Sequence, residues 1–303
     1  MSVHSNFAIL QYNTMKSRDK VMAPLLRDPT IWDYDVLAIQ EPWHNKHNNS
    51  THHPCKDRFH LVYPEPTEGE STRVCFYINS RLNRADWTVQ THSRDLMTLK
   101  IQYTEHSQSK RLCIHNVYRE AVRGDTTATL EQLNGLLEDD HWQHIIVGDF
   151  NLHHPTWGGL GVEEDPQAEQ LIQMMDERQL SLLLPQGSVT WRSQQACSTI
   201  DLVLGSPDIT QRLISCEVQQ RHHDSDHYPI ATHLLLSAAE ATPRSYRQWD
   251  RADIKLLQQT LAEQLPTPLH NYNGPNMEQH ITAITEAIQA AVKATVPMST
   301  PSK

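Results

Sequence analysis

The sequence predicts an α/β protein followed by a short helical segment. Up to about residue 236, runs of apolar and β-branched residues typical of buried strands alternate with segments of helical periodicity. Beyond residue 238 the composition changes, and the apolar patterns over residues 252–265 and 277–296 have the helical period only. We therefore expect one α/β domain over residues 1–238 and a helical linker segment over residues 239–303.

The first half of the chain contains most of the predicted strands. Apolar runs typical of strands cover residues 7–13, 35–43, 74–78, 87–92, 96–103 and 111–118. A helix is expected from Ser17, where Pro24 either kinks the helix or lies in the first turn of a later one. Residues 44–72 are rich in His, Asn, Pro and Glu, and we expect a long polar loop there.

The second half continues the alternation of helices and strands. One helix is expected over residues 125–141, with Asp125 or Thr126 as its N-cap, and another over residues 165–179, which opens with an Asp-Pro pair. The central strand runs through Ile145, Ile146 and Val147 and stops at Gly148. Further strands are expected at residues 189–191, 199–204 and 230–236.

The charge of the chain limits how it can bind nucleic acid. The formal net charge is −10, and residues 243–303 hold six basic and five acidic side chains, which leaves −11 on residues 1–242. Tight non-specific binding of a polyanion needs a basic surface. Any binding of nucleic acid should therefore be local, weak or assisted by a metal ion.

The apolar runs and the cysteines indicate where the protein is located and which stabilising cross-links it lacks. No run of about 18 apolar residues occurs, and no basic segment followed by an apolar one opens the chain, so we expect no membrane span, no secretory signal and an intracellular protein. The five cysteines are scattered and form no Cys-x-x-Cys pair, which argues against a disulfide framework and against a structural zinc site. We expect the cysteines to be small buried hydrophobic residues.

Polar side chains follow the apolar runs where five predicted strands end. Asp149 and Asn151 are two residues apart, so on extended backbone both side chains leave on the same side. Taken alone, Gly-Asp-x-Asn is equally typical of a turn. The repetition at five strand ends indicates a site, whose members are Asn13, Glu41, Asp149, Asn151, Asp201, Asp226 and His227.

The chemistry of these side chains indicates a metal ion and a phosphate. Oxygen ligands without cysteine favour Mg²⁺ or Mn²⁺, which typically use one or two carboxylates together with a substrate phosphate. An acidic pocket that holds Mg²⁺ attracts phosphate, which the bare protein would repel. Asp201 lies among apolar neighbours and needs a partner, and His227 is a suitable one, because a carboxylate can orient an imidazole.

Short motifs in this chain resemble those of the endonuclease/exonuclease/phosphatase superfamily, which includes DNase I and exonuclease III. In order along the chain they are Gln11-x-Asn13, Gln40-Glu41, Asn116-x-Tyr118, Gly148-Asp149-Phe150-Asn151, Ile200-Asp201 and Ser225-Asp226-His227. Within that superfamily, the sequence over residues 149–159, 198–204 and 225–230 is most similar to that of the endonuclease domain of non-LTR (LINE-type) retrotransposons. The resemblance spans about residues 7–236. Residues 246–253 resemble the linker that precedes the reverse transcriptase in such polyproteins, so the chain is expected to be an N-terminal piece of one.

The resemblance implies a DNase I-like fold, a two-sheet α/β sandwich flanked by helices, with the site at the rim where strand ends of both sheets meet. By the family pattern Glu41 is the principal metal ligand, and the other ligands to Mg²⁺ or Mn²⁺ are Asn13, Asp149 and Asp226. Asp201 orients His227. The residues implied to contact DNA are Tyr118, Asn151, His153 and Thr190, of which Tyr118 and Asn151 hold the phosphate.

The function implied is a Mg²⁺-dependent endonuclease in the nucleus that nicks double-stranded DNA and so primes reverse transcription, with a reverse transcriptase domain following in the full-length polyprotein. Alternatives on the same fold are an abasic-site repair endonuclease and a phosphatase or phospholipase. A further alternative is a degenerate domain that binds nucleic acid without cleaving it, which the presence of every motif residue disfavours.

Overall fold

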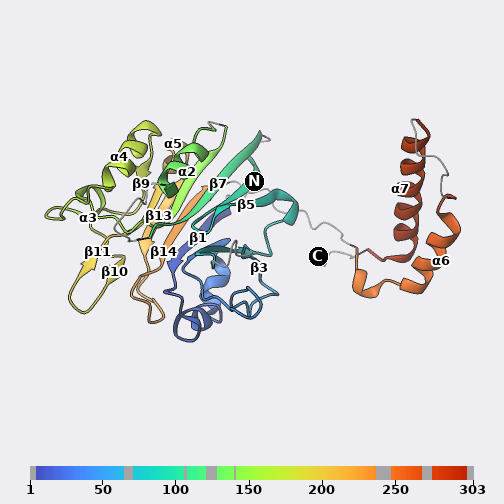
Figure 1. The fold of residues 1–303 in the computed structure, drawn as a ribbon, viewed down its shortest axis with the longest axis horizontal. Helices are drawn as coiled ribbons and strands as arrows, with labels where there is room; N and C mark the ends of the chain where they lie inside the picture. Colours follow the sequence, from blue (N-terminus) through green and yellow to red (C-terminus); the bar gives the residue numbers. More distant parts are fainter. Residues whose placement is uncertain are drawn as a thin grey trace. The chain divides into compact units, whose positions relative to one another are not determined.

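The computed structural model describes residues 5–64, 71–105, 108–120, 128–139, 141–236, 247–267 and 275–298 (Figure 1). The chain divides into two compact units, Met1–Ala239 and Glu240–Lys303. The first unit holds all the strands of both sheets and every predicted site residue.

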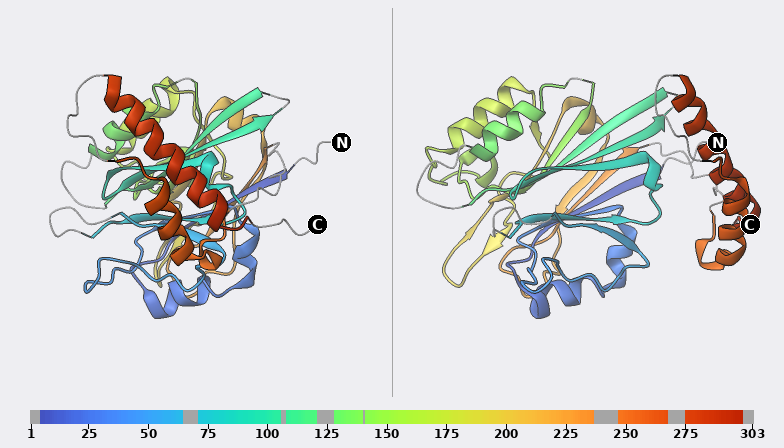
Figure 2. Two further views of the ribbon diagram at one scale, coloured as in Figure 1. Left: turned by 90° about the vertical axis from the view of Figure 1, so that its right-hand side faces the viewer. Right: turned by 45° about the vertical axis from the view of Figure 1, so that its right-hand side comes forward.

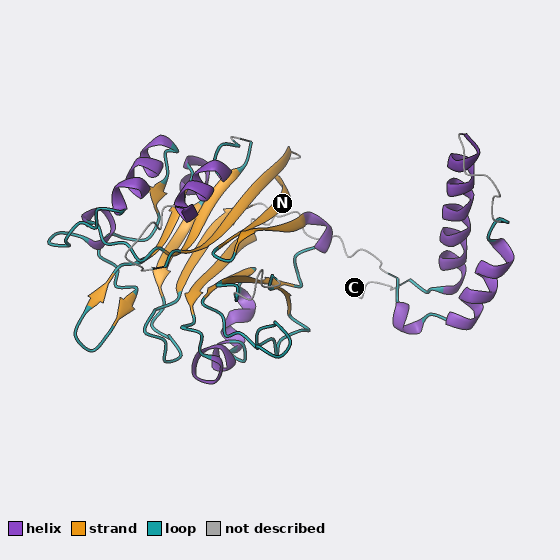
Figure 3. Cartoon of the chain, in the orientation of Figure 1, coloured by secondary structure: helices purple, strands orange, loops and turns teal. Residues whose placement is uncertain are grey.

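Twelve strands of the first unit form two six-stranded mixed sheets (Figure 3). The first sheet has the order β13 (Leu213–Val218), β14 (Ile230–Leu236), β1 (Ser5–Asn13), β2 (Val36–Gln40), β4 (Val74–Asn79) and β3 (Phe59–Val62). The second sheet has the order β5 (Trp87–Ser93), β6 (Leu96–Glu105), β7 (Gln108–Tyr118), β8 (Gln143–Asp149), β12 (Asp201–Gly205) and β9 (Ser181–Leu182). The predicted two-sheet α/β sandwich is confirmed.

Helices lie on the outer sides of both sheets, as the right-hand view of Figure 2 shows. Those near the N-terminus are a π-helix η1 (Arg18–Met22), α1 (Ala23–Leu25) and two 3₁₀ helices, η2 (Pro29–Asp33) and η3 (Arg84–Asp86). The second sheet is accompanied by α2 (Ala128–Leu136), α3 (Pro155–Gly158), α4 (Ala168–Glu177) and α5 (Pro207–Gln211). A small hairpin consists of β10 (Trp191–Arg192) and β11 (Cys197–Ser198).

The second unit is helical, with a 3₁₀ helix η4 (Trp249–Arg251) followed by α6 (Ile254–Gln264) and α7 (Pro275–Thr295). Asp253 caps α6 through a bond from the Leu256 backbone N–H to its carboxylate, at 3.0 Å. Arg247 donates to the carbonyl oxygens of Val292 and Val296 at the end of α7. Across the described part of the chain, no helix is both long enough and apolar enough to span a membrane.

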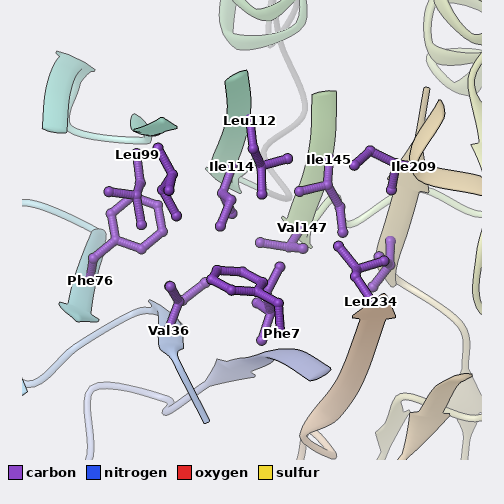
Figure 4. Close-up of a cluster of buried hydrophobic side chains, with 14 of the residues drawn as sticks. Phe7, Val36, Phe76, Leu99, Leu112, Ile114, Ile145, Val147, Ile209 and Leu234 are labelled. Carbon is purple, nitrogen blue, oxygen red and sulfur yellow. The ribbon is translucent and has the colours of Figure 1, made fainter. Parts of the chain in front are cut away.

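The main core lies between the two sheets (Figure 4). Along β7 and β8 alternate side chains point inward, because successive residues of a strand face opposite sides. Inward residues Leu112, Ile114 and Ile145 therefore belong to one buried cluster with Phe7 and Val36 of the first sheet. The outer face of the second sheet packs against α2 and α4, and that of the first sheet packs against η1, α1 and η2. Covering both faces of each sheet explains why the strand sequences are almost continuously apolar.

Local structure differs from the expectations at identifiable places. Pro24 lies in the first turn of α1, as one of the two alternatives had it, although helical structure already begins at Arg18 with the π-helix η1. The loop expected over residues 44–72 contains β3, and β13 was not predicted, because both are short edge strands with weak apolar patterns. Cys197 is exposed in β11, so the expectation that all the cysteines are buried is wrong for it. The N-cap expected at residues 125–126 lies outside the described residues.

An amide side chain ties the two sheets together below one rim. Asn116 of β7 donates to the carbonyl oxygens of Ile39 at 3.2 Å and Cys75 at 2.9 Å, both in the first sheet. Its own Oδ1 accepts from Gln40 Nε2 at 2.6 Å. All these groups are buried, where an unpaired amide would be costly, so the contact holds the sheets in one register. The strand ends that follow Gln40 and Asn116 thereby reach the same rim.

The closest backbone approach near this rim generates a stability prediction. A Cβ built on Gly148 would lie 2.1 Å from the Val117 carbonyl oxygen of the neighbouring strand, and neither backbone can move freely. Gly148→Ala should therefore lower the free energy of unfolding by at least about 3 kcal/mol. Gly135, which is exposed in α2 with nothing within 4 Å of such a Cβ, provides the control.

Gly135→Ala should leave the unfolding free energy unchanged or raise it by up to about 1 kcal/mol, because alanine favours helix. Urea unfolding of both variants measures the difference. A loss of less than about 1 kcal/mol in Gly148→Ala, well below the cost of overpacking a core, would show that the strands separate easily here.

Candidate active site

Two carboxylates face each other at the rim of the second sheet. Asp149 ends β8 and Asp201 begins β12, and the antiparallel register pairs them directly. Both are almost completely buried, with exposed fractions of 1%. Like charges opposite one another in a sheet are destabilising, and burial adds to the effect. Burial first, and then Asp201, raise the pKa of Asp149 to about 8.

A buried histidine lies between the two carboxylates. His227 Nδ1 is 2.8 Å from Asp201 Oδ2, and its Nε2 is 3.9 Å from Asp149 Oδ2. Burial would lower the pKa of His227, but Asp201 outweighs it and the pKa is raised to about 9. The expected Asp–His pair is therefore present geometrically, and His227 carries the positive charge that compensates the carboxylates.

Asn13 connects this group to the first sheet. Its Nδ2 donates to Asp149 Oδ2 at 2.9 Å, and its backbone carbonyl accepts from Ser225 Oγ at 3.0 Å. The same Ser225 hydroxyl accepts the His227 N–H at 3.2 Å. One strand end of the first sheet thus holds both the Asp149 carboxylate and the loop that carries His227.

Glu41 follows β2 at the same rim and has a fixed backbone. Its φ of 46° lies in the left-handed region, which is unfavourable for a glutamate. The conformation is held because its N–H donates to the Arg73 carbonyl at 2.8 Å and its own carbonyl accepts from Lys16 N at 2.8 Å and Thr14 Oγ1 at 2.9 Å. The strained residue thereby presents its carboxylate at the rim.

The Glu41 carboxylate pairs with Lys16, whose Nζ is 2.8 Å from Oε1. The Lys16 side chain is 62% exposed and that of Glu41 is 14% exposed, so the ammonium approaches from solvent and can leave. Tyr118 is the neighbour on the protein side: burial, followed by the charges of Glu41 and Asp149, raises the pKa of its hydroxyl. The Tyr118 hydroxyl is therefore a neutral donor close to both carboxylates.

Asn151 and Arg119 shape the turn after β8. Asn151 has φ of 48°, a conformation that asparagine tolerates, and its Nδ2 donates to the Arg119 carbonyl at 2.8 Å. The Arg119 guanidinium in turn donates to the carbonyl oxygens of Phe150 and Asn151, both at 3.3 Å. Asn151 N–H donates to Asp149 Oδ1 at 3.1 Å, so both oxygens of Asp149 have protein partners.

Asp226 is hydrogen-bonded to a side chain outside the group of Asp149, Asp201 and His227. Its Oδ2 accepts from Trp191 Nε1 at 2.9 Å, while its Oδ1 is buried and has no hydrogen-bond partner among the described residues. The charge of Asp226 helps to raise the pKa of His227. Asp226 therefore lies close enough to the histidine to act on its charge, and one of its buried carboxylate oxygens has no described partner.

Thr190 does not have the position expected of a DNA contact. Its side chain is completely buried, and its hydroxyl accepts the N–H groups of Ile200 and Asp201, both at 3.0 Å. Its backbone carbonyl accepts from Tyr228 N at 2.7 Å, next to His227. Thr190 is thus a positioning residue for the Asp201–His227 pair, and the expected contact with DNA is corrected because no part of the hydroxyl faces solvent.

His153 is exposed at the mouth of a cleft of about 320 Å³. The lining includes His153, Gly187, Val189, Trp191, Cys197 and Thr199. Trp191 connects this cleft to the site through its bond to Asp226. His153 and the β10–β11 hairpin therefore form an accessible surface next to the buried group.

The residues at the rim fit a divalent cation. The donors are carboxylate oxygens of Glu41 and Asp149 and the unpartnered Oδ1 of Asp226, all hard oxygen ligands. Burial and then the charge of Asp201 raise the pKa of Asp149, and a cation beside the carboxylate would oppose both effects. Lys16 now neutralises Glu41 and is free to move into solvent when a cation binds.

Sequence reasoning missed the residues that hold the site in place. Arg73 forms a two-pronged ion pair with Asp95, and its guanidinium lies 4.8 Å from the centre of the Tyr118 ring. The Tyr118 N–H also donates to the Asp95 carbonyl at 2.9 Å. Arg73 and Asp95 stand in ordinary strand-end and turn sequence with no motif, so only the fold reveals their role.

One segment of the chain is similar to a known protein family. Residues 112–231 match the family model described as endonuclease-reverse transcriptase. This segment includes Tyr118, Asp149, Asp201 and His227, whereas Glu41 precedes it. A search of curated protein sequences finds no significant match.

Several solved structures share the fold at low sequence identity. The endonuclease domain of TRAS1, a telomere-specific non-LTR retrotransposon, matches with a TM-score of 0.59 and 17% identity, covering 77% of this chain and 100% of that one. The AP endonuclease LMAP from Leishmania major matches with a TM-score of 0.55 and 12% identity, covering 76% and 88%. The 3′ phosphatase NExo from Neisseria, bound to a product DNA hairpin, matches with a TM-score of 0.52 and 16% identity, covering 75% and 99%. Residues 112–231 are therefore similar to the endonuclease-reverse transcriptase family model, and the first unit has the fold of these nuclease and phosphatase structures.

Proposed function

We propose that this chain is a Mg²⁺-dependent endonuclease that nicks double-stranded DNA to prime reverse transcription of a non-LTR retrotransposon. The observation that carries the proposal is the buried group of Asp149, Asp201 and His227, whose ligand atoms all lie within 4.8 Å of one another. Tyr118 connects this group to Glu41, because the charges of both Glu41 and Asp149 act on its hydroxyl. The name of the matched family joins an endonuclease to a reverse transcriptase, which supports a polyprotein origin.

In the proposed reaction a water attacks the scissile phosphorus, the bond from phosphorus to the 3′ oxygen breaks, and the leaving oxygen takes up a proton. His227 is a cation at neutral pH and donates from Nε2 to the phosphate, where negative charge develops. Asp201 holds the ring through Nδ1, so that Nε2 faces the substrate. The ionised form of Asp149, whose pKa is raised to about 8, accepts the proton that the attacking water loses.

Other side chains of the rim bind and orient the substrate in this proposal. The neutral hydroxyl of Tyr118 donates to a phosphate oxygen, and Asn151 fixes the turn beside it. Glu41, together with Asn13, Asp149 and Asp226, would hold the divalent ion. The bound ion supplies Lewis-acid stabilisation of the charge on the phosphate and the leaving oxygen.

DNA is the proposed substrate because related folds act on it. The NExo structure contains a DNA hairpin product, and the TRAS1 domain belongs to a retrotransposon endonuclease. The acidic surface of residues 1–242 implies weak binding outside the site, so targeting strength would come from other parts of the polyprotein. Action on chromosomal DNA would place the protein in the nucleus.

Metal dependence is the first test of the proposal. Supercoiled plasmid should be converted to the nicked form with Mg²⁺ or Mn²⁺ and remain intact in EDTA, because the rim supplies only oxygen ligands for the ion. Glu41→Gln should lower nicking by about 10²-fold or more and regain part of it at high Mn²⁺. Glu169→Gln, an exposed change on α4, is the control.

Nicking that survives EDTA would refute the metal assignment. The same preparations should be offered a duplex with one abasic site and a small phosphoester. A strong preference for the abasic duplex over intact plasmid would favour a repair endonuclease, and turnover of the small ester alone would favour a phosphatase.

The pH dependence of nicking tests the role of Asp201. Asp201 is the main influence that raises the pKa of His227, so Asp201→Asn should let burial lower it. His227 would then lose its proton at lower pH, and the alkaline limb of the pH profile should move to lower pH. Nicking near pH 8 should fall by about 10² to 10⁴. Asp208→Asn, an exposed change on α5, should alter neither the pH profile nor the nicking rate.

Thermal melts of both variants establish that they are folded. If Asp201→Asn keeps more than about a tenth of wild-type activity, a loss of only ~1.4 kcal/mol in transition-state binding, and keeps the wild-type pH profile, Asp201 is only a structural carboxylate.

A further inference from the structure

A second cluster of reactive side chains lies at the other end of the second sheet. It consists of Cys113 and His115 of β7 and His144 of β8. Cys113 precedes Tyr118 by five residues, His115 precedes it by three, and His144 precedes Asp149 by five, which corresponds to roughly 10 to 17 Å along a strand. The cluster therefore belongs to a place in the fold that the proposed nuclease chemistry does not use.

The strand register brings these three residues together. Cys113 and His144 are direct partners in the parallel pair of β7 and β8, and His115 is two residues beyond Cys113 on the same face. The residues between them, such as Ile114, point into the core between the sheets. All three side chains of the cluster therefore leave the sheet on its outer, helix-covered side.

Their donor atoms converge in a closed space. One ligand atom from each residue lies within 4.8 Å of the other two, and the residues are 2%, 1% and 5% exposed in sequence order. His115 Nε2 is 3.0 Å from His144 Nδ1, and the two rings are stacked with centroids 5.3 Å apart. Two imidazoles and a thiol in one buried volume are unusual for a purely structural core.

The outer nitrogens of both histidines are held by neighbouring groups. His144 Nε2 lies 3.2 Å from the Asp139 carbonyl, which can only accept, so this nitrogen carries the proton and Nδ1 presents a lone pair to the centre. His115 Nδ1 is 2.9 Å from Thr98 Oγ1, which is in turn 2.9 Å from His92 Nε2. Histidines that bind metals are typically oriented in this way through the second ring nitrogen.

We propose that Cys113 Sγ, His115 Nε2 and His144 Nδ1 form a binding site for a thiophilic transition metal ion, for which Zn²⁺ is the representative. Sulfur and imidazole ligands suit Zn²⁺ and disfavour Mg²⁺, so the site is chemically distinct from the oxygen donors at the rim. Three protein ligands leave a fourth position of a tetrahedral ion for water. The sequence argued against a zinc site because its ligands come from two strands without a Cys-x-x-Cys pair.

The protons balance on binding. The thiol of Cys113 releases one proton as the sulfur becomes a thiolate. His115 gives up its Nε2 proton and accepts a proton at Nδ1 from the Thr98 hydroxyl. The Thr98 hydroxyl regains a proton from His92 Nε2. Half-buried His92 then accepts a proton from solvent at Nδ1. The net release is one proton per ion. Burial, which raises the pKa of Cys113 to about 12, keeps the thiol protonated until an ion binds.

The test uses the full chain with Mg²⁺ in excess, so that the oxygen ligands at the rim are occupied. Wild type should bind one equivalent of Zn²⁺ in equilibrium dialysis and release one proton. With Co²⁺ as the probe, a thiolate-to-cobalt charge-transfer band should appear in the near ultraviolet. Cys113→Ser should lose the band and bind Zn²⁺ at least about tenfold more weakly, and His144→Gln should weaken binding similarly.

Matched variants separate this site from others. Cys216→Ser replaces another buried cysteine, which contacts Thr232, and should keep the band. His227→Ala should also keep it, which excludes binding at the rim. Retained plasmid nicking shows that Cys113→Ser is folded; if that variant does not fold, the cobalt band and the proton release of wild type decide. Absence of the band in wild type, or Zn²⁺ binding unchanged in both folded cluster variants, would overturn the proposal and leave a hydrogen-bonded histidine cluster only.

Discussion

Two buried carboxylates face each other across neighbouring strands, and the other groups at the rim are arranged to compensate their charge. The register of β8 and β12 makes Asp149 and Asp201 direct partners, and water does not reach them to screen their charges. Such a pair is stable only with a cation or a proton close by. The positive charge of His227 compensates the carboxylates, and the amide of Asn13 donates to Asp149. The hydroxyl groups of Ser225 and Thr190 hold the segments that carry His227 and Asp201.

The two-sheet architecture is what brings these groups to one place. Asn13 and Glu41 come from the first sheet, and Asp149 and Asp201 come from the second. Asn116 holds the sheets in register below the rim through three hydrogen bonds, and Gly148 permits β7 and β8 to approach each other closely. Packing in the core thus determines distances at the site, because a shift of one sheet against the other would separate Asn13 from Asp149.

Much of this was predictable from the strands. Long apolar runs, such as those before Asp149 and Glu41, predicted buried strands and polar groups at their ends, because alternation and burial are local properties of sequence. What was not predictable depends on tertiary contacts. The role of Arg73 beneath Tyr118 and the buried position of Thr190 follow from register and from loop paths. The edge strand β13 was missed because half-buried edge strands carry little apolar pattern. The convergence of Cys113 with His144 likewise needs the parallel pairing.

The central claim is that Asp201 and His227 act as one unit beside Asp149, and a double-mutant cycle tests it most directly. Nicking rates on supercoiled plasmid should be measured for Asp201→Asn, His227→Ala and the double variant, with thermal melts to confirm folding. Residues that act as a unit are not additive, so the double variant should be no slower than the more severe single variant. If the two losses multiply instead, with each single variant slower by about 10² or more and the double slower by their product, the residues act independently and the account of the site is wrong.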